Sequence, residues 1–311
     1  MTTIAIVIVN YNTCEYLRRC LASIHEGDAV EVIVVDNAST DGSAEMVRTC
    51  YPHVTLRAKK SNAGYGAAAN EAIASCNADY ILLLNSDTLL QSNTAHALQS
   101  YLDRHPQTAL VGPRLNNSDG TLQASCYPYP TPFNLFLEES LLGRLVAYIP
   151  GVRNRYLRTW PHDKARSVPW VLGAALAMRR DAFLAVGGFD PTFFMYFEEI
   201  DLCRRLRAAG WQIDFAPVTT IVHIGGASTS QQYAEMQYRL FSSTQLFYRR
   251  HYTGWQMRFF HLTMLPIIIA RLVRDAVRYS RMRNPQEREK SLATLHVRYR
   301  MLRECVFSFA L

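Results

Sequence analysis

Short apolar runs alternate with helical patterns through the first half of this 311-residue chain, and this alternation constrains the fold most. The runs cover residues 4–9, 30–35, 54–58 and 80–84, with helix-like stretches between them near residues 15–25, 43–50 and 66–75. Brief runs rich in β-branched residues or leucine are typical of buried parallel strands. Their alternation with helices predicts βαβ units, and hence an α/β fold with a doubly wound, mostly parallel sheet.

The rest of the chain is less regular up to about residue 230 and helical in pattern after it. The prolines near residue 130 indicate a loop. The segment 150–169 indicates a long connection between secondary-structure elements. We expect a strand over 170–178, a helix over 200–209, and a strand pair or kinked strand over 213–223. The pattern predicts two parts, an α/β domain over residues 1–230 and a helical, basic extension over residues 231–311.

Polar residues follow three of the predicted strands directly. They are Asn10 to Asn12, Asp36 with Asn37, and Asn85 to Asp87. In doubly wound sheets, ligands bind outside the carboxyl ends of the strands. A carboxylate at the position of Asp36 can accept hydrogen bonds from a ribose or a base, although its neighbours also favour a turn. Asp87 is well placed to hold a hard divalent cation between a diphosphate and the protein.

A glycine-containing segment, residues 62–66, precedes a helix of small residues. Glycine lets the backbone approach a ligand closely, and a helix N-terminus favours an anion such as a pyrophosphate. The alternative is a simple turn into the helix. Both interpretations stay open at this point.

Three carboxylates, Glu198, Glu199 and Asp201, fall within four positions at a predicted helix start. A carboxylate that is to deprotonate a sugar hydroxyl needs to lie in a cleft. The aromatic residues of 193–197 would supply the walls of that cleft. The alternative is an acidic first helical turn stabilised by the helix dipole. His223 ends a predicted strand, where an imidazole can complete the coordination of Mn²⁺ or Mg²⁺ beside Asp87, or can be structural.

The net charge of +7 is concentrated at the C-terminus. From Arg249 onward there are thirteen Arg or Lys residues against four acidic ones, which gives this part +9. Such a segment predicts an anionic partner. We expect a membrane surface or a lipid phosphate and no nucleic acid, because no nucleic-acid motif is present and the basic residues lie among aliphatic runs.

Helical spacing near Pro266 refines this expectation. The apolar stretch 264–270 is too short for a spanning helix, which needs about 20 apolar residues. Beyond it, Arg271, Arg274 and Arg278 share one helical face, while Leu272, Val273 and Ala276 continue the side of Ile268 and Ile269. The pattern predicts a helix that lies in a membrane interface. The alternative is that its apolar face packs on the α/β domain or on a second subunit, as in a homo-oligomer.

The cysteines and the first apolar run indicate where in the cell the protein is located. Seven scattered cysteines with no CxxC spacing predict reduced thiols in a cytoplasmic protein. The run at residues 4–9 is too short for the core of a signal peptide and has no basic residue before it. We therefore expect a cytoplasmic protein.

Six segments together resemble the family 2 glycosyltransferases of the GT-A fold, in particular their bacterial rhamnosyltransferase-like branch. They read IVIVNYN (6–12), VIVVDNASTDGS (32–43), NAGYGAAANEAI (62–73), YILLLNSD (80–87), GGFDPTFFMYFEEIDLCRRLRAAGW (187–211) and HIGGAS (223–228). They follow the family's order over roughly residues 1–230. The last eighty residues carry no such motif.

The resemblance implies a role for each candidate residue. Donor binding falls to Tyr11, Asp36, Asn37, Gly64, Tyr65, Asn85, Ser86 and Asp87; metal binding to Asp87 and His223; acceptor binding to Trp170 and Gly173; and the base to Glu199, with Glu198 and Asp201 as competitors. Two positions depart from the family pattern. The DxD element reads Asn85-Ser86-Asp87, and the base position holds glutamate in place of aspartate.

The resemblance implies a metal-dependent, inverting glycosyltransferase that uses Mg²⁺ or Mn²⁺ and a nucleotide-sugar donor. The leading expectation is transfer of L-rhamnose from dTDP-rhamnose to a glycan or lipid-linked saccharide, at the inner face of the cytoplasmic membrane. A nicotinamide-dependent oxidoreductase would need GxGxxG where residues 10–18 have no glycine. A sugar nucleotidyltransferase would need a glycine-rich loop with Lys or Arg there. A non-catalytic carbohydrate or lipid-phosphate-binding module remains the third interpretation.

Overall fold

The computed structural model describes residues 3–25, 31–139, 160–226 and 233–309. The chain forms two compact units, one of Met1–Tyr129 with Tyr156–Ser228 and one of Pro130–Arg155 with Thr229–Leu311. The second unit thus takes in a segment that precedes the helical C-terminus in the sequence. The predicted domain boundary between residues 230 and 231 lies outside the described residues.

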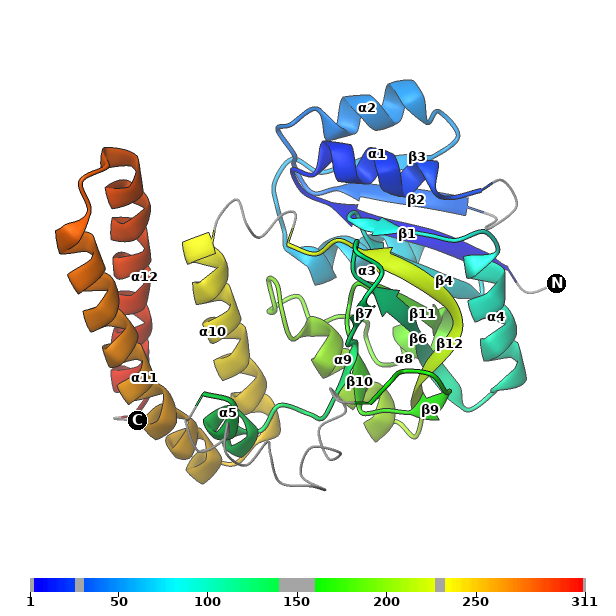
Figure 1. The fold of residues 1–311 in the computed structure, drawn as a ribbon. Coiled ribbons are helices and arrows are strands. Elements are labelled where there is room, and N and C mark those ends of the chain that lie inside the picture. The colour runs from blue at the N-terminus through cyan, green and yellow to red at the C-terminus, as the bar shows by residue number, and fades with distance from the viewer. Residues whose placement is uncertain (1–2, 26–30, 140–159, 227–232, 310–311) are drawn as a thin grey trace. The chain divides into compact units, whose positions relative to one another are not determined.

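A mixed, mostly parallel sheet forms the centre of the first unit, as predicted (Figure 1). Its strand order is β3-β2-β1-β4-β11-β6-β12-β5. The four strands predicted first, β1 (Ile4–Asn10), β2 (Glu31–Asp36), β3 (Thr55–Ala58) and β4 (Tyr80–Asn85), pair in parallel. The others are β5 (Thr88–Leu89), β6 (Thr108–Asn116), β11 (Ala175–Arg179) and β12 (Gln212–His223), with β7 (Leu122–Gln123) and β9 (Arg166–Ser167) at the side. Every side chain of β1 is buried, because helices cover both faces of the sheet.

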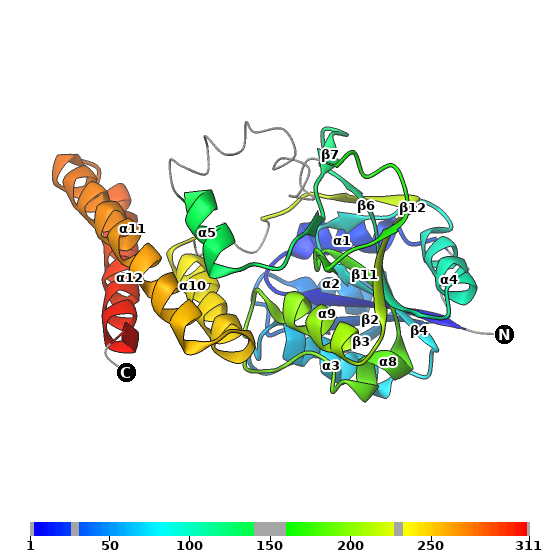
Figure 2. The same ribbon diagram turned by 90° about the horizontal axis from the view of Figure 1, so that it is seen from below.

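The helices α1 (Cys14–Ala22), α2 (Ser43–Cys50) and α4 (Thr94–Arg104) pack on one face, where their apolar side chains share a core with alternate residues of β1 and β4. On the other face, α3 (Tyr65–Ser75) contacts β1 and β2 through small side chains (Figures 1 and 2). Two more helices, α8 (Arg180–Ala185) and α9 (Glu198–Ala208), follow β11. The carboxyl ends of β1, β2 and β4 therefore lie at one edge of the sheet.

One strand prediction needs correction, and another is decided between its two alternatives. The strand expected over 170–178 is two strands, β10 (Trp170–Val171) and β11, separated by residues 172–174. The first of them pairs with β8 (Cys126–Tyr127) in a separate small sheet. The strand pair or kinked strand expected over 213–223 is the single strand β12, whose register with β6 shifts between Phe215 and Thr220, next to Pro217. Because proline cannot donate to the ladder, it interrupts the pairing without ending the strand.

The second unit is helical, which confirms the prediction for the C-terminal part. Its helices are α5 (Pro132–Glu139), α10 (Tyr233–His251), α11 (Gly254–Arg281) and α12 (Pro285–Phe309). The helix α11 packs along α12 and contacts α5 and α10, and it continues through Pro266. In the described part of the chain, no helix combines the length and the apolar character that crossing a membrane requires.

Candidate active site

A chain of hydrogen bonds joins the polar residues at the carboxyl ends of β1, β2 and β4. Asp36 accepts bonds from the Asn10 amide (2.9 Å) and from the backbone N–H of Ser39 (3.0 Å). The Thr13 hydroxyl lies 2.6 Å from Asn10 Oδ1 and 2.7 Å from the Ser86 hydroxyl. The parallel register places Asn10 beside Asp36 and Val9 beside Asn85. The structure therefore brings Asp36 and Ser86 to one edge of the sheet, with Asp36 buried and engaged in the turn that follows β2.

Asn37 fixes the turn that leads into α3. Its side chain accepts from the N–H of Ala63 (3.1 Å) and donates to Asn62 (2.8 Å) and to the carbonyl of Gly64 (3.1 Å). Gly64 has φ +89°, and a Cβ there would lie 2.5 Å from the carbonyl oxygen of Phe194. Only glycine fits this position, because a side chain would meet both backbone strain and a steric overlap.

Asp87 and His223 face each other although 136 positions separate them in the sequence. The backbone pairing of β12 with β5 sets His223 opposite Thr88, and His223 Nε2 lies 3.3 Å from Asp87 Oδ1. The other ring nitrogen of His223 lies 2.7 Å from Gln123 Oε1. Gln123 thus orients the imidazole and leaves Nε2 directed at Asp87, an arrangement common among metal-binding histidines.

These two residues suit a cation that is shared with a substrate. Among the residues that the structure describes, no group of three or more His, Cys, Asp or Glu side chains is placed to hold a metal ion. Mg²⁺ and Mn²⁺ sites in phosphate-transferring enzymes use one or two protein ligands and complete their coordination with substrate oxygens. A pair formed by Asp87 and the oriented His223 fits such a site.

Two adjacent carboxylates begin α9. Burial raises the pKa of Glu199 above its usual value, against hydrogen bonds that it accepts from backbone N–H groups including that of Gly173. Burial, and then the charge of Glu199, raise the pKa of Glu198 well above its usual range. Each carboxylate has one buried oxygen with no hydrogen-bond partner among the described residues. Unsatisfied buried carboxylate oxygens are unusual in folded proteins, so these two call for an explanation beyond folding.

Tyr65 links these carboxylates to the metal-binding pair. Its hydroxyl donates to the carbonyl of Gly173 (3.4 Å). Burial raises its pKa well above the usual value, and the charges of Glu198, Glu199 and Asp87 raise it further. The structure thus gathers Tyr65, Gly173, Glu198, Glu199 and Asp87 into one region.

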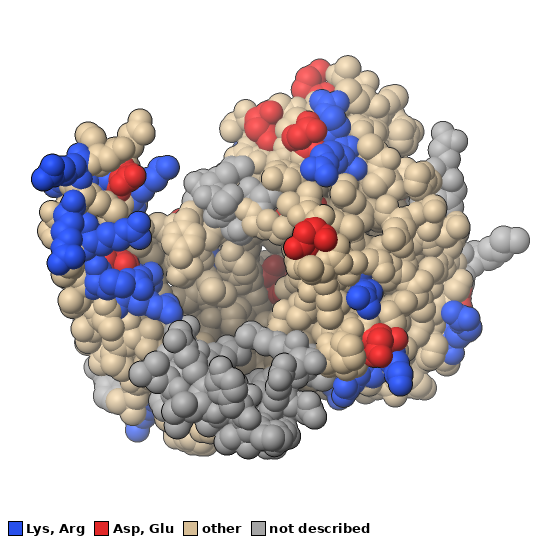
Figure 3. Space-filling view, viewed as in Figure 1, with Lys and Arg blue, Asp and Glu red and all other residues tan. Residues whose placement is uncertain are grey.

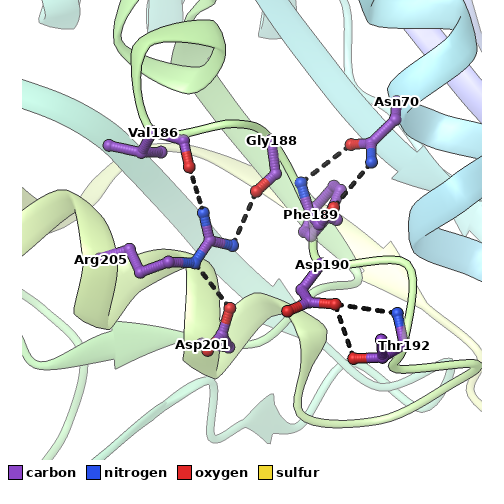
Figure 4. Close-up of polar contacts among 8 residues, drawn as sticks. All are labelled: Asn70, Val186, Gly188, Phe189, Asp190, Thr192, Asp201 and Arg205. Atoms are coloured by element: carbon purple, nitrogen blue, oxygen red, sulfur yellow. Dashed lines mark hydrogen bonds and ion pairs between the residues drawn. The ribbon is translucent and has the colours of Figure 1, made fainter. Parts of the chain in front are cut away.

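Asp201 lies in a different environment (Figure 4). It is 1% exposed and accepts a bond of 2.7 Å from Arg205 on the next turn of α9. The same guanidinium donates to the carbonyls of Val186 (2.6 Å) and Gly188 (2.7 Å). The contacts of Asp201 thus link α9 to the loop through Arg205, and its charge is already paired.

Asn70 of α3 holds the same loop from its other side (Figure 4). Its amide donates to the carbonyl of Phe189 (2.7 Å) and accepts from the Phe189 N–H (2.8 Å). Further along, the Tyr65 N–H donates to the carbonyl of Phe194 (3.0 Å). The loop over residues 186–197 is thus bonded to α3 and α9, which carry Tyr65 and Glu199.

Of the other predicted residues, Tyr11 is half-buried, and the N–H of Asn85 donates to the carbonyl of Ala174 (3.0 Å). Trp170 is buried against Tyr127 and donates from its indole to the carbonyl of Pro128 (2.9 Å). It supports the strand that leads to Gly173. Gln123 and Thr13 were not predicted, because hydrogen-bonding partners distant in the sequence leave no local pattern.

Comparison with known proteins places the chain in a family. Residues 5–200 match the family described as Glycosyl transferase family 2. The chain therefore belongs to glycosyltransferase family 2, and it is a rhamnosyltransferase-like glycosyltransferase.

Two relatives show how far the similarity extends. The chain is 30% identical over 298 residues to N-acetylglucosaminyl-diphospho-decaprenol L-rhamnosyltransferase of Mycobacterium tuberculosis, which covers 89% of this chain and 95% of that protein. It is 25% identical over 229 residues to the rhamnosyltransferase WbbL of Escherichia coli, covering 70% of this chain and 82% of WbbL.

Solved structures agree on the GT-A-like fold. The mannosyltransferase PcManGT from Pyrobaculum calidifontis, in complex with GDP-Man and Mn²⁺, superposes with a TM-score of 0.51 at 18% identity, over 99% of this chain and 74% of that one. GalNAc-T7 with UDP, GalNAc and Mn²⁺ gives a TM-score of 0.54 at 14% identity, over 71% of this chain and 43% of that one.

Proposed function

We propose that this enzyme transfers L-rhamnose from dTDP-rhamnose to a lipid-linked saccharide, with inversion at the anomeric carbon. The observation that carries the proposal is the similarity to a rhamnosyltransferase along nearly the whole of both chains. The name of that relative specifies a saccharide on a polyprenyl diphosphate as its acceptor. An acceptor of this kind would place the enzyme at the inner face of the cytoplasmic membrane.

The site supports a direct displacement. The acceptor hydroxyl would attack the anomeric carbon while the bond from that carbon to the diphosphate oxygen breaks on the opposite face. Glu199 would take the hydroxyl proton on its unpartnered oxygen, since burial raises its pKa and so makes the carboxylate a stronger proton acceptor. Of the three candidate carboxylates we choose Glu199, because Gly173 orients it and Arg205 already binds Asp201.

Asp87 and His223 would hold a divalent cation. A Mg²⁺ or Mn²⁺ ion bound there would neutralise charge on the leaving nucleoside diphosphate. Tyr11, Asp36 and Asn37 would contact the nucleoside at the edge of the sheet. Gly64 lets the backbone approach the donor, and Gly173 with Trp170 would form the floor under the acceptor.

A donor screen tests the reaction. Purified enzyme is mixed with Mg²⁺ or Mn²⁺, a polyprenyl-diphosphate saccharide and a panel of nucleotide sugars, and the released nucleoside diphosphate is measured. We expect turnover with dTDP-rhamnose that depends on the acceptor. Efficient transfer from a UDP-hexose, with no turnover of dTDP-rhamnose, would show that the donor proposal is wrong.

The role of Asp87 can be tested separately. Asp87→Asn keeps the shape of the side chain and removes its charge, so we expect it to fold, to lose turnover and to lose most metal-stimulated donor binding. Asp163→Asn changes an exposed carboxylate of the same unit and serves as the control. Normal, metal-stimulated activity of Asp87→Asn would remove the metal assignment.

A further inference from the structure

The outward face of α11 carries a line of large apolar side chains. Trp255, Leu262, Ile269, Val273 and Val277 are each between 43% and 69% exposed. At 3.6 residues per turn they fall within an arc of about 80° and extend over about 33 Å of the helix. We call these five residues the α11 stripe. A surface helix of a soluble protein usually turns polar residues outward, so a continuous exposed stripe indicates a partner.

The stripe is separate from the apolar face that holds the helix in its unit. Phe260, Met264 and Ile268 are buried on the opposite side of α11. The sequence pattern had grouped Ile268 with Ile269 on a single face. In the structure Ile268 is 1% exposed and Ile269 is 43% exposed, so α11 has both a packed face and an outer one.

The exposed charge of α11 is positive throughout. The helix contains five arginines and one acidic residue, Asp275. Asp275 is 8% exposed and is ion-paired with Arg298 of α12 (2.8 Å) and with Arg274 (3.0 Å), so it adds little exposed negative charge. Figure 3 shows Lys and Arg side chains gathered over the part of the molecule that α11 and α12 form. By helical spacing, Arg281 and Arg274 lie beyond one edge of the stripe, and Arg258 lies beyond the other.

We propose that the α11 stripe is a contact surface for a membrane rich in anionic phospholipid. Apolar side chains would enter the boundary of the acyl chains while the arginines on both flanks bind the headgroups. Trp255 at the start of the helix is of the residue type that prefers this interface. The positive charge beside the stripe favours an anionic membrane over a second copy of the chain as the partner. A second copy of the chain would pair the stripe with itself and set arginines against arginines. The inference rests on the proposed function in one respect: the proposed lipid-linked acceptor gives the enzyme a reason to bind a membrane.

Vesicle flotation with the full-length protein tests the surface. The vesicles contain phosphatidylglycerol and phosphatidylcholine, or phosphatidylcholine alone, with neither acceptor nor donor present. We expect binding to the anionic vesicles that weakens with salt, and little binding to the neutral ones. Failure of the wild-type protein to bind anionic vesicles at low salt would overturn the proposal. Equal binding to both vesicle types would overturn the part that the arginines play.

A charge-matched pair of variants isolates the stripe. The double variant Ile269→Asp/Val273→Asp places two carboxylates in the stripe, and we expect it to bind anionic vesicles at least about tenfold more weakly. The control Leu184→Asp/Val218→Asp adds the same charge at exposed apolar positions of the first unit, and we expect it to bind as the wild type does. If both double variants bind equally and more weakly than the wild type, net charge and not the stripe holds the protein to the membrane; if both bind as the wild type does, the stripe is not the contact surface.

The two proposals fail separately. Vesicle binding needs neither sugar transfer nor an acceptor, so an enzyme that binds anionic vesicles but never uses dTDP-rhamnose refutes only the donor. An active transferase that does not bind the vesicles refutes only the proposal that the α11 stripe contacts a membrane. As a direct probe of its position, Trp255 fluorescence is expected to shift to the blue on vesicle binding, and the Trp255→Phe variant should lose that shift.

Discussion

Glu198, Glu199 and Asp201 lie within one helical turn yet differ in what surrounds them. Asp201 has Arg205 as a charged partner, whereas Glu198 and Glu199 each keep a buried oxygen without a partner among the described residues. Leaving a buried polar group unpaired costs about 1–3 kcal/mol, so folding alone does not favour the two glutamates. Such a cost is typical of residues retained for chemistry.

Glu199→Gln tests the base directly. The amide keeps the size of the side chain and cannot take a proton, so we expect donor affinity near wild type and a fall in kcat of ~10²–10⁴-fold. Asp201→Asn should instead lower the melting temperature, because it weakens the bond to Arg205. A well-folded Asp201→Asn variant without activity, beside a nearly wild-type Glu199→Gln, would move the base to Asp201.

Glu198→Gln should stabilise the protein in a pH-dependent way. Burial raises the pKa of Glu198 in the folded state, so the folded protein disfavours the charged form. Below the ordinary pKa of glutamate both states are protonated, and the penalty is absent. It grows as pH rises above that value and is complete above the raised pKa of the folded state. We expect a gain of ~1–3 kcal/mol in the free energy of unfolding at pH 7.5 and almost none near pH 4.

Urea unfolding at the two pH values measures this effect. Glu289→Gln, on an exposed position of α12, is the control and should change little at either pH. A Glu198→Gln variant less stable than wild type at pH 7.5 would mean that the carboxylate has a stabilising partner in solution.

At the scale of elements, the site depends on two helix starts that meet at one loop. The loop of residues 186–197 is bonded to Asn70 of α3 and to Arg205 of α9. The N-terminal ends of these helices carry Tyr65 and the two glutamates. Any shift of the loop would therefore move both the aromatic residue and the carboxylates.

Gly64→Ala should disturb this junction more than Gly42→Ala does. Both glycines have a positive φ, so each variant meets backbone strain, on the order of 1 kcal/mol. Only at Gly64 does the new Cβ also overlap a backbone atom, the carbonyl oxygen of Phe194; at Gly42 nothing lies within 4 Å. We expect a clear loss of kcat/KM and of melting temperature for Gly64→Ala, and a small loss of stability with near-normal kcat/KM for Gly42→Ala. Equal activity of the two variants would contradict the close packing of Gly64 against the Phe194 carbonyl.

The sequence predicted the elements whose signal is local. The strands β1, β2 and β4 are continuous apolar runs, and the helix Ser43–Cys50 has the predicted bounds. No strand was predicted at β6, where Gly112 and Pro113 interrupt the apolar run and where the residues that complete its pairing lie far along the chain. The same reason explains the site. The motifs indicate Asp87 and His223, but the contact of His223 with Gln123 exists only once β7 and β12 are in place.

At the scale of the molecule, the chemistry and the basic surface belong to different units. Every candidate site residue falls within Met1–Tyr129 or Tyr156–Ser228, while the α11 stripe and its arginines fall within the other unit. The helical unit has its own buried ion pair between Asp275 and Arg298, which joins α11 to α12. Breaking a buried pair by removing one partner is costly, because it leaves the other charge uncompensated.

Asp275→Asn should therefore destabilise the helical unit and leave the donor site intact. Hydrogen bonds from Arg298 and Arg274 outweigh the effect of burial and hold the pKa of Asp275 below its usual value. The stabilisation is thus present above the unfolded pKa and is lost as pH falls through the folded one. At pH 7 we expect a loss of ~3 kcal/mol for the helical unit, seen as a lower melting temperature of α11 and α12 in hydrogen exchange or calorimetry. Donor affinity measured by titration calorimetry should stay at the wild-type value. A parallel loss of donor affinity would show that the two units do not act separately, and unchanged unfolding would show that the pair contributes no stability.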